Sequence, residues 1–265
     1  MRNLGTNKIL WLLTAVLTFA VALLGALRPA IYAGVLPVHM LPGTLSQDLL
    51  SVAAAVVLFV LALRARAGSY KLHIVILGVL GYLFYAYGIY AIERVYNLLY
   101  YVYLATFGLS FYALIYGVAS FQPEALRSAA LPGGLRKLAA GFSLFIAVLF
   151  SILWIVMLLP MLQSGQKPEA TYSIYILDLS FIMPAFVILA VMALRRQGLG
   201  LVLTPAMYVL GVTLLFPVGL GELFKPMYGF PVDPFGVGLY LGIAALFLVA
   251  LGLYLPRLSF GKRAE

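Results

Sequence analysis

The sequence predicts an all-α integral membrane protein with eight transmembrane helices, arranged as two parallel four-helix repeats in a single membrane domain over residues 1–265. Three observations lead to this prediction: the composition, the lengths of the apolar runs, and a correspondence between the two halves of the chain. The chain is 65% hydrophobic and only 9% charged, whereas soluble domains carry about 25% charged residues. It therefore lacks the polar side chains that would cover a soluble surface.

Apolar runs long enough to cross a bilayer recur along the whole chain. A transmembrane helix needs about 20 predominantly apolar residues. The predicted spans cover approximately residues 9–27, 48–63, 72–92, 98–119, 138–160, 173–194, 199–222 and 236–255. The first run lacks the short core and small-residue cleavage site of a signal peptide, so we expect a retained helix.

The basic residues are divided unequally between the connections on the two sides of the membrane. Thirteen of the seventeen lie on the side that holds the termini: Arg2, Lys8, Arg64, Arg66, Lys71, Arg127, Arg136, Lys137, Arg195, Arg196, Arg257, Lys262 and Arg263. The other side holds Arg28, Arg94, Lys167 and Lys225. Because basic loops stay in the cytoplasm, we expect cytoplasmic termini in the plasma (inner) membrane of a prokaryotic cell.

An internal repeat relates Asp48 to Asp178, which lie 130 positions apart. The same offset also aligns Arg66 with Arg196 and gives nine identities within the 35 positions from 48 to 82. Repeat 1 would cover about residues 1–130 and repeat 2 about 131–265. Each repeat holds an even number of spans, so the two copies should be parallel. The alternative is a chance alignment of two apolar hairpins.

Four carboxylates are predicted at similar heights near the outer boundary of the membrane. Asp48 begins the second predicted span and Asp178 lies near the start of the sixth, while Glu93 and Glu222 close the third and seventh. A charge within a span is costly and often functional, so we expect an outward-facing acidic vestibule, with Asp178 as the leading candidate. The structural alternative places each aspartate at a helix N-terminus, where the macrodipole favours it, and pairs Glu222 with Lys225.

Three further residues could assist such a vestibule. The Arg94 guanidinium could clamp an anionic group, although anchoring a lipid phosphate is the alternative. The hydroxyls of Tyr90 and Tyr175 could point into the polar space, because buried hydroxyls normally find partners. The proline-containing segment 28–47 should pack over the outer opening of the vestibule. The prolines and glycines in 216–234 predict that the seventh helix ends irregularly or unwinds there.

These features favour a protein that binds or transports a small polar solute or cation. Two alternatives remain: an intramembrane enzyme acting on a lipid-type substrate, and a non-catalytic membrane partner or sensor subunit. We expect no cofactor and no metal site, because the chain has no cysteine and only two histidines, which lie at different depths. The basic residues sit in short loops, so no nucleic-acid partner is expected. The predicted partners are the lipid bilayer and a small polar solute or cation.

Overall fold

The structure is a computed structural model that describes residues 2–167 and 171–261. Lys262 and Arg263, which enter the charge argument above, lie outside the described residues. Within the described part of the chain, eight helices are long and apolar enough to cross a membrane. This confirms the predicted helical membrane class and the eight predicted spans.

The spans differ in how they are built. Six of them contain the helices α1 (Leu4–Leu27), α2 (Leu41–Arg64), α3 (Tyr70–Ile92), α4 (Tyr100–Ala119), α6 (Gly133–Ser164) and α10 (Pro234–Arg257). The sixth span combines α7 (Tyr172–Leu177), the π-helical segment η3 (Asp178–Ile182) and α8 (Met183–Leu194). The seventh span continues from α9 (Gly198–Phe224) into the 3-10 segment η4 (Lys225–Tyr228).

Short elements connect these spans. The 3-10 segments η1 (Pro29–Tyr32) and η2 (Val38–Met40) lie between α1 and α2, and α5 (Pro123–Ser128) precedes α6. The strands β1 (Ala129–Ala130) and β2 (Ser259–Phe260) pair antiparallel, with Ala129 opposite Phe260. This pairing ties the connection before α6 to the end of α10.

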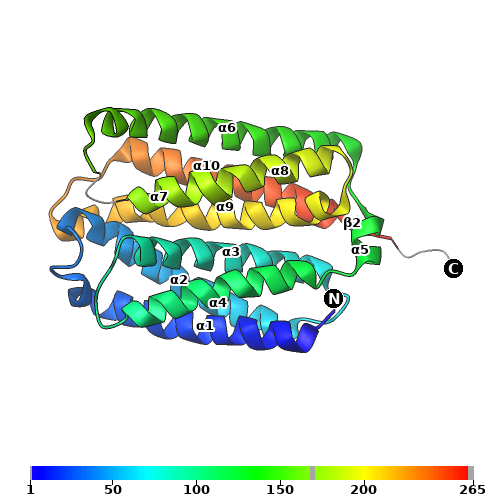
Figure 1. Cartoon of the computed structure of the whole chain (residues 1–265), viewed down its shortest axis with the longest axis horizontal. Helices are drawn as coiled ribbons and strands as arrows, with labels where there is room; N and C mark the ends of the chain where they lie inside the picture. Colours follow the sequence, from blue (N-terminus) through cyan, green and yellow to red (C-terminus); the bar gives the residue numbers. More distant parts are fainter. Residues whose placement is uncertain (1, 168–170, 262–265) are drawn as a thin grey trace.

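The helices form two groups that lie side by side with roughly parallel axes (Figure 1). We call α1–α4 the first group and α6–α10 the second group. Helices α3 and α9 meet between them, and α2 also packs on α9. Gly78 permits the close approach, because a Cβ there would collide with the side chain of Val209 and lie 2.8 Å from the carbonyl oxygen of Ala206.

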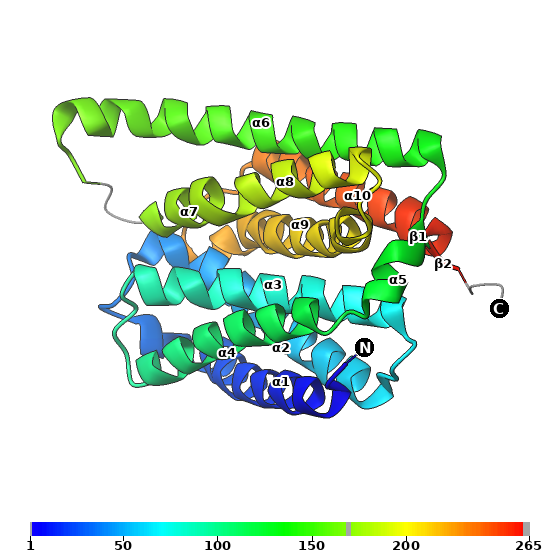
Figure 2. The ribbon, with the colours of Figure 1, turned by 45° about the vertical axis from the view of Figure 1, so that its right-hand side comes forward.

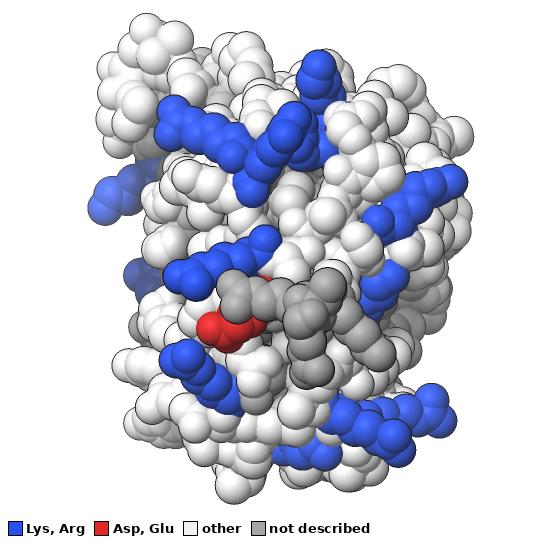
Figure 3. Space-filling model, turned by 90° about the vertical axis from the view of Figure 1, so that its right-hand side faces the viewer, with Lys and Arg blue, Asp and Glu red and all other residues white. Residues whose placement is uncertain are grey.

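The helix α6 forms the outer edge of the second group (Figure 2). It packs mainly on α8 and touches α10 only slightly. The start of α1 and the end of α10 lie at the same end of the bundle (Figure 1). Viewed from that end, Lys and Arg side chains are spread over the surface and acidic side chains are scarce (Figure 3).

One sequence expectation is wrong at a helix boundary. Helix α2 begins at Leu41 rather than near Asp48; Pro42 occupies the first turn, where its missing N–H is not needed. Helix α9 continues past Pro217 to Phe224 and ends in the 3-10 segment η4, so the irregular end predicted within 216–234 is present. The carbonyl of Pro217 accepts a hydrogen bond from Ser46 Oγ at 2.6 Å, which ties this part of α9 to the start of α2.

Candidate functional site

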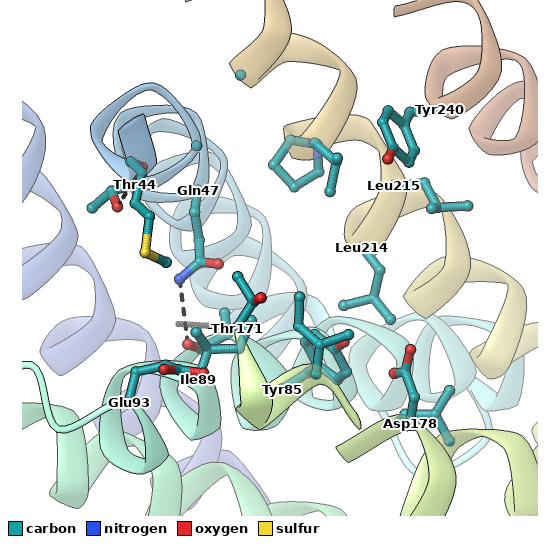
Figure 4. A pocket seen from close by; sticks show the side chains of 18 of the residues that line it. Thr44, Gln47, Tyr85, Ile89, Glu93, Thr171, Asp178, Leu214, Leu215 and Tyr240 are labelled. Carbon is teal, nitrogen blue, oxygen red and sulfur yellow. Dashed lines mark hydrogen bonds between the residues drawn. The ribbon is translucent and has the colours of Figure 1, made fainter. Parts of the chain in front are cut away.

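A cavity of about 720 Å³ lies between the two groups, in the part of the bundle away from the chain ends. Its walls come from the start of α2, the end of α3, and from α6, α7, α9 and α10 (Figure 4). The connection before α2 also contributes Leu36, His39 and Met40. Most of the lining is apolar, and its charged side chains are Glu93, Asp178, Glu222 and Lys225.

Asp178 is the cavity residue whose hydrogen bonding is incomplete. Its side chain is only 6% exposed. Oδ2 accepts a hydrogen bond from the indole Nε1 of Trp154 at 2.7 Å, whereas Oδ1 is buried and accepts none from the described residues. The hydroxyl of Tyr85 lies close enough to the Asp178 carboxyl to interact with it, although no hydrogen bond to Oδ1 is formed, and the carboxyl group points toward Leu214 (Figure 4). A buried acceptor without a partner is costly, so this oxygen is suited to receive a donor from a ligand.

The backbone at Asp178 widens into a π-helical turn, in which the N–H of Met183 bonds to the carbonyl of Asp178. The following residue is Pro184, which has no N–H to donate to Ser180 and whose ring would crowd that carbonyl in a regular α-helix. The wider turn relieves this conflict. Such single-turn π segments occur frequently at functional sites.

Glu93 lines the same cavity and connects the two groups. Its Oε1 accepts a hydrogen bond from the backbone N–H of Ser173 at 2.8 Å, at the start of α7. The hydroxyl of Tyr172 donates to the carbonyl of Ile92 close by. Glu93 at the end of α3 therefore satisfies a free N–H in the first turn of α7.

Glu222 and Lys225 lie together on another part of the cavity wall. Glu222 Oε2 is 2.6 Å from Lys225 Nζ, so the ion pair expected at this spacing is present. The side chains are 15% and 30% exposed, respectively. Part of the negative charge of the cavity is thus balanced by a neighbouring ammonium group.

The three assisting candidates occupy different positions. Tyr175 lines the cavity and packs edge-to-face on Trp154, with ring centroids 5.5 Å apart. Tyr90 also reaches the cavity wall, but its hydroxyl donates to Asp48 Oδ1 at 2.9 Å. Arg94 is exposed, has a left-handed backbone with φ of 55°, and is not among the residues that line the cavity.

Asp48 lies within the first group and is not part of the cavity lining. It is 1% exposed, and its two oxygens accept hydrogen bonds from Tyr32 at 2.7 Å and from Tyr90. Burial, and secondarily the nearby Asp48 carboxyl, raise the pKa of Tyr32 well above its ordinary value, so this hydroxyl keeps its proton and donates. Gly25 makes room for the cluster, since a Cβ there would collide with the Asp48 carboxyl.

Neither aspartate occupies the helix N-terminal position that the structural alternative required. Asp48 lies seven residues after the first residue of α2, and Asp178 lies six residues after the start of α7. The macrodipole acts mainly within the first turn. Asp48 is instead held by two tyrosines, and Asp178 by the indole of Trp154, with the Tyr85 hydroxyl close by.

Sequence reasoning missed Trp154, Tyr32 and Gly25. Trp154 carried a usable signal: it is one of only two tryptophans, it lies within an apolar run, and a buried indole N–H needs an acceptor. Tyr32 lies in a connection, and no periodicity links it or Gly25 to Asp48.

The described residues contain no group of three or more His, Asp or Glu side chains that could hold a metal ion. Comparison with protein-family models, with curated proteins and with solved structures finds no match to this chain. The cavity is a mainly apolar chamber that contains the Asp178 carboxyl group, whose Oδ1 has no hydrogen-bond donor among the described residues.

Proposed function

We propose that the protein binds a small cationic solute in the cavity between the two groups and carries it across the membrane. The observation that carries the proposal is Asp178, whose Oδ1 is buried at the cavity without a hydrogen-bond donor among the described residues. An acidic group within a span is expensive unless it has a partner. A cation in the cavity would supply that partner, and it would also meet the carboxyl of Glu93 on the same wall.

The direction of the cavity follows from the distribution of charge. The end of the bundle that is rich in Lys and Arg (Figure 3) is assigned to the cytoplasm. The cavity lies toward the other end, so it would face outward. This orientation also places both chain ends in the cytoplasm.

The arrangement of the helices supports transport over simple binding. The two groups coincide with the two predicted parallel repeats, and transporters commonly place their substrate between such repeats. Toward the cytoplasmic end, the cavity meets Phe247, whose ring contacts Phe142, Phe186 and Tyr208. Separation of this aromatic cluster would open the inner route that transport needs.

The two alternatives receive less support. An enzyme acting on a lipid-type substrate needs a free acid and a free base near one point, but Glu222 is paired with Lys225 and Glu93 bonds to Ser173. A non-catalytic partner protein would be expected to fill the space between the groups. A cavity of about 720 Å³ there favours a ligand.

Thermal unfolding in detergent across a panel of organic and inorganic cations tests this proposal. A binding cation at about 100 times its Kd should stabilise the wild type by roughly 2.7 kcal/mol. The stabilisation should vanish in Asp178→Asn and persist in Glu124→Gln, which removes one acidic charge from α5 at the other end of the bundle. Equal stabilisation of Asp178→Asn and the wild type would contradict a binding role for the carboxyl group.

Transport itself needs a second measurement. The wild-type protein in sealed proteoliposomes should accumulate the stabilising cation, whereas vesicles holding Asp178→Asn should match protein-free vesicles. Binding without uptake would leave a receptor-like protein rather than a transporter.

A further inference from the structure

We infer that the solute is an amphipathic organic ammonium ion, with one protonated amine on an apolar body. This inference rests on the proposed function, because it specifies which cation the cavity receives. Three features of the cavity lead to it: its ligand groups, its size, and the character of its walls.

The ligand groups do not suit a bare metal ion. Hard cations such as Ca²⁺ take six to eight oxygen ligands. At Asp178, Oδ2 is already bonded to Trp154, and Oδ1 has no hydrogen-bond donor among the described residues, with the Tyr85 hydroxyl close by. No group of three or more acidic or histidine side chains is present among the described residues to supply the rest. The Oδ1 atom instead matches the N–H of one ammonium group, which forms a strong charge-assisted hydrogen bond.

The cavity is far larger than an ion. Its volume of about 720 Å³ falls within the 300–1,000 Å³ typical of sites for small organic molecules. An ion at Asp178 would leave most of this space as a void or as water against apolar walls. An organic body attached to the ammonium group would fill it.

Aromatic and aliphatic side chains both line the cavity around Asp178. Trp154, Tyr175 and Tyr85 lie at the carboxyl end, where aromatic faces attract a cation. Leu214 and Leu215 of α9 continue the wall beyond the carboxyl group, and Tyr240 lies further on (Figure 4). We therefore place the ammonium group against Asp178 and the apolar body along this face of α9.

The chain offers its own reporter for this site. It contains two tryptophans: Trp154 at the cavity, and Trp11 buried in the first group, where its ring packs against His73. In Trp11→Phe, Trp154 becomes the sole indole, and its fluorescence should respond when a ligand binds Asp178. Linear alkylamines and the neutral alcohols of equal chain length are the probes.

The expected result has two parts. Each added methylene should tighten amine binding about fourfold, as burial of a CH₂ group predicts, until the chain fills the cavity. Each amine should bind at least about tenfold more tightly than its alcohol, and this preference should disappear in Asp178→Asn. Trp154→Phe, which keeps Trp11, measures the response that arises from partitioning into the detergent.

A second variant leaves the carboxyl group in place. Leu214→Phe should narrow the cavity, so long amines should lose affinity at least about tenfold while methylammonium binding stays unchanged. This variant tests the location of the apolar body even if Asp178→Asn fails to fold.

The outcomes separate this inference from the function on which it rests. Equal affinities for amines and alcohols would overturn the ammonium assignment and leave a cavity that binds apolar solutes. Binding of inorganic cations alone would overturn the amphipathic body and leave a cation site. Failure of every probe and every cation to bind would refute both proposals.

Discussion

Replacing each aspartate by asparagine should separate two carboxyl groups that the sequence alone makes equivalent. In Asp48→Asn, one of two acceptor oxygens becomes an NH₂ group that faces a tyrosine hydroxyl, at a site that is 1% exposed. The variant loses one hydrogen bond and leaves a buried donor unsatisfied. We expect a loss of about 2–4 kcal/mol in the free energy of unfolding.

The same substitution at Asp178 should cost much less. The amide oxygen of Asp178→Asn can still accept the hydrogen bond from Trp154. The NH₂ group replaces an oxygen that has no hydrogen-bond donor among the described residues. We expect the free energy of unfolding to change by less than about 1 kcal/mol, because the hydrogen bond from Trp154 is kept and the NH₂ group can donate to the nearby hydroxyl oxygen of Tyr85.

Unfolding of both variants by SDS in mixed micelles, followed by far-ultraviolet circular dichroism, measures this difference. Circular dichroism is preferable to fluorescence, since Asp178→Asn alters the surroundings of Trp154. A difference of about 2 kcal/mol corresponds to roughly a 30-fold change in the unfolding equilibrium constant. If Asp178→Asn loses as much stability as Asp48→Asn, the distinction between a bonded and an incompletely bonded carboxyl is wrong.

Three further predictions concern the first group and the orientation of the chain. Gly25→Ala should destabilise the fold by about 1–3 kcal/mol through overpacking. Gly108 is a helical glycine where an added Cβ would have no atom within 4 Å, so Gly108→Ala should be neutral or stabilising by up to about 1 kcal/mol. SDS unfolding of the two variants measures both changes. Tyr90→Phe should cost about 1–3 kcal/mol by removing a donor to a buried carboxyl, and a double-mutant cycle with Asp48→Asn should show non-additive losses. Because the chain has no cysteine, Ser164→Cys should react with a membrane-impermeant maleimide on intact cells, while Gly134→Cys should react only after permeabilisation.

Each of these predictions has an opposing result. Similar losses in the two glycine variants would show that Gly25 is not in a tight contact. Strict additivity would separate Tyr90 energetically from the carboxyl group. Labelling of Gly134→Cys on intact cells would invert the proposed orientation, and the cavity would then face the cytoplasm.

The membrane helices were predictable because each one is marked by a long run of apolar residues. An apolar run of some 20 residues tolerates several polar exceptions, so all eight spans were found. The start of α2 was not found, because Pro42, Gly43, Thr44, Ser46 and Gln47 have the composition of a loop. These residues are helical in a buried setting, where Ser46 Oγ bonds to Pro217 of α9. No local sequence signal carries that long-range contact.

For the candidate site, the sequence predicts several of the residues that line the cavity but not their contacts. Asp178, Glu93 and Glu222 do line one cavity, together with Tyr90 and Tyr175. The exclusion of Asp48 depends on Tyr32, which reaches it from the connection after α1. Depth along a helix gives the height of a side chain but not its direction around the helix axis or the neighbour that it meets.

The wide turn at Asp178 has a consequence for comparing the two halves of the chain. Helix α2 is a regular α-helix from Leu41 to Arg64, whereas the π-helical segment interrupts the helix that carries Asp178. One extra residue in a turn rotates the residues before it by roughly 100° about the helix axis relative to the residues after it. Two aspartates at aligned positions can then point in different directions. Asp48 points into the first group, and Asp178 points into the cavity between the two groups. A change in backbone winding, with no insertion in the alignment of the two halves, is enough to point the two aspartate side chains in different directions.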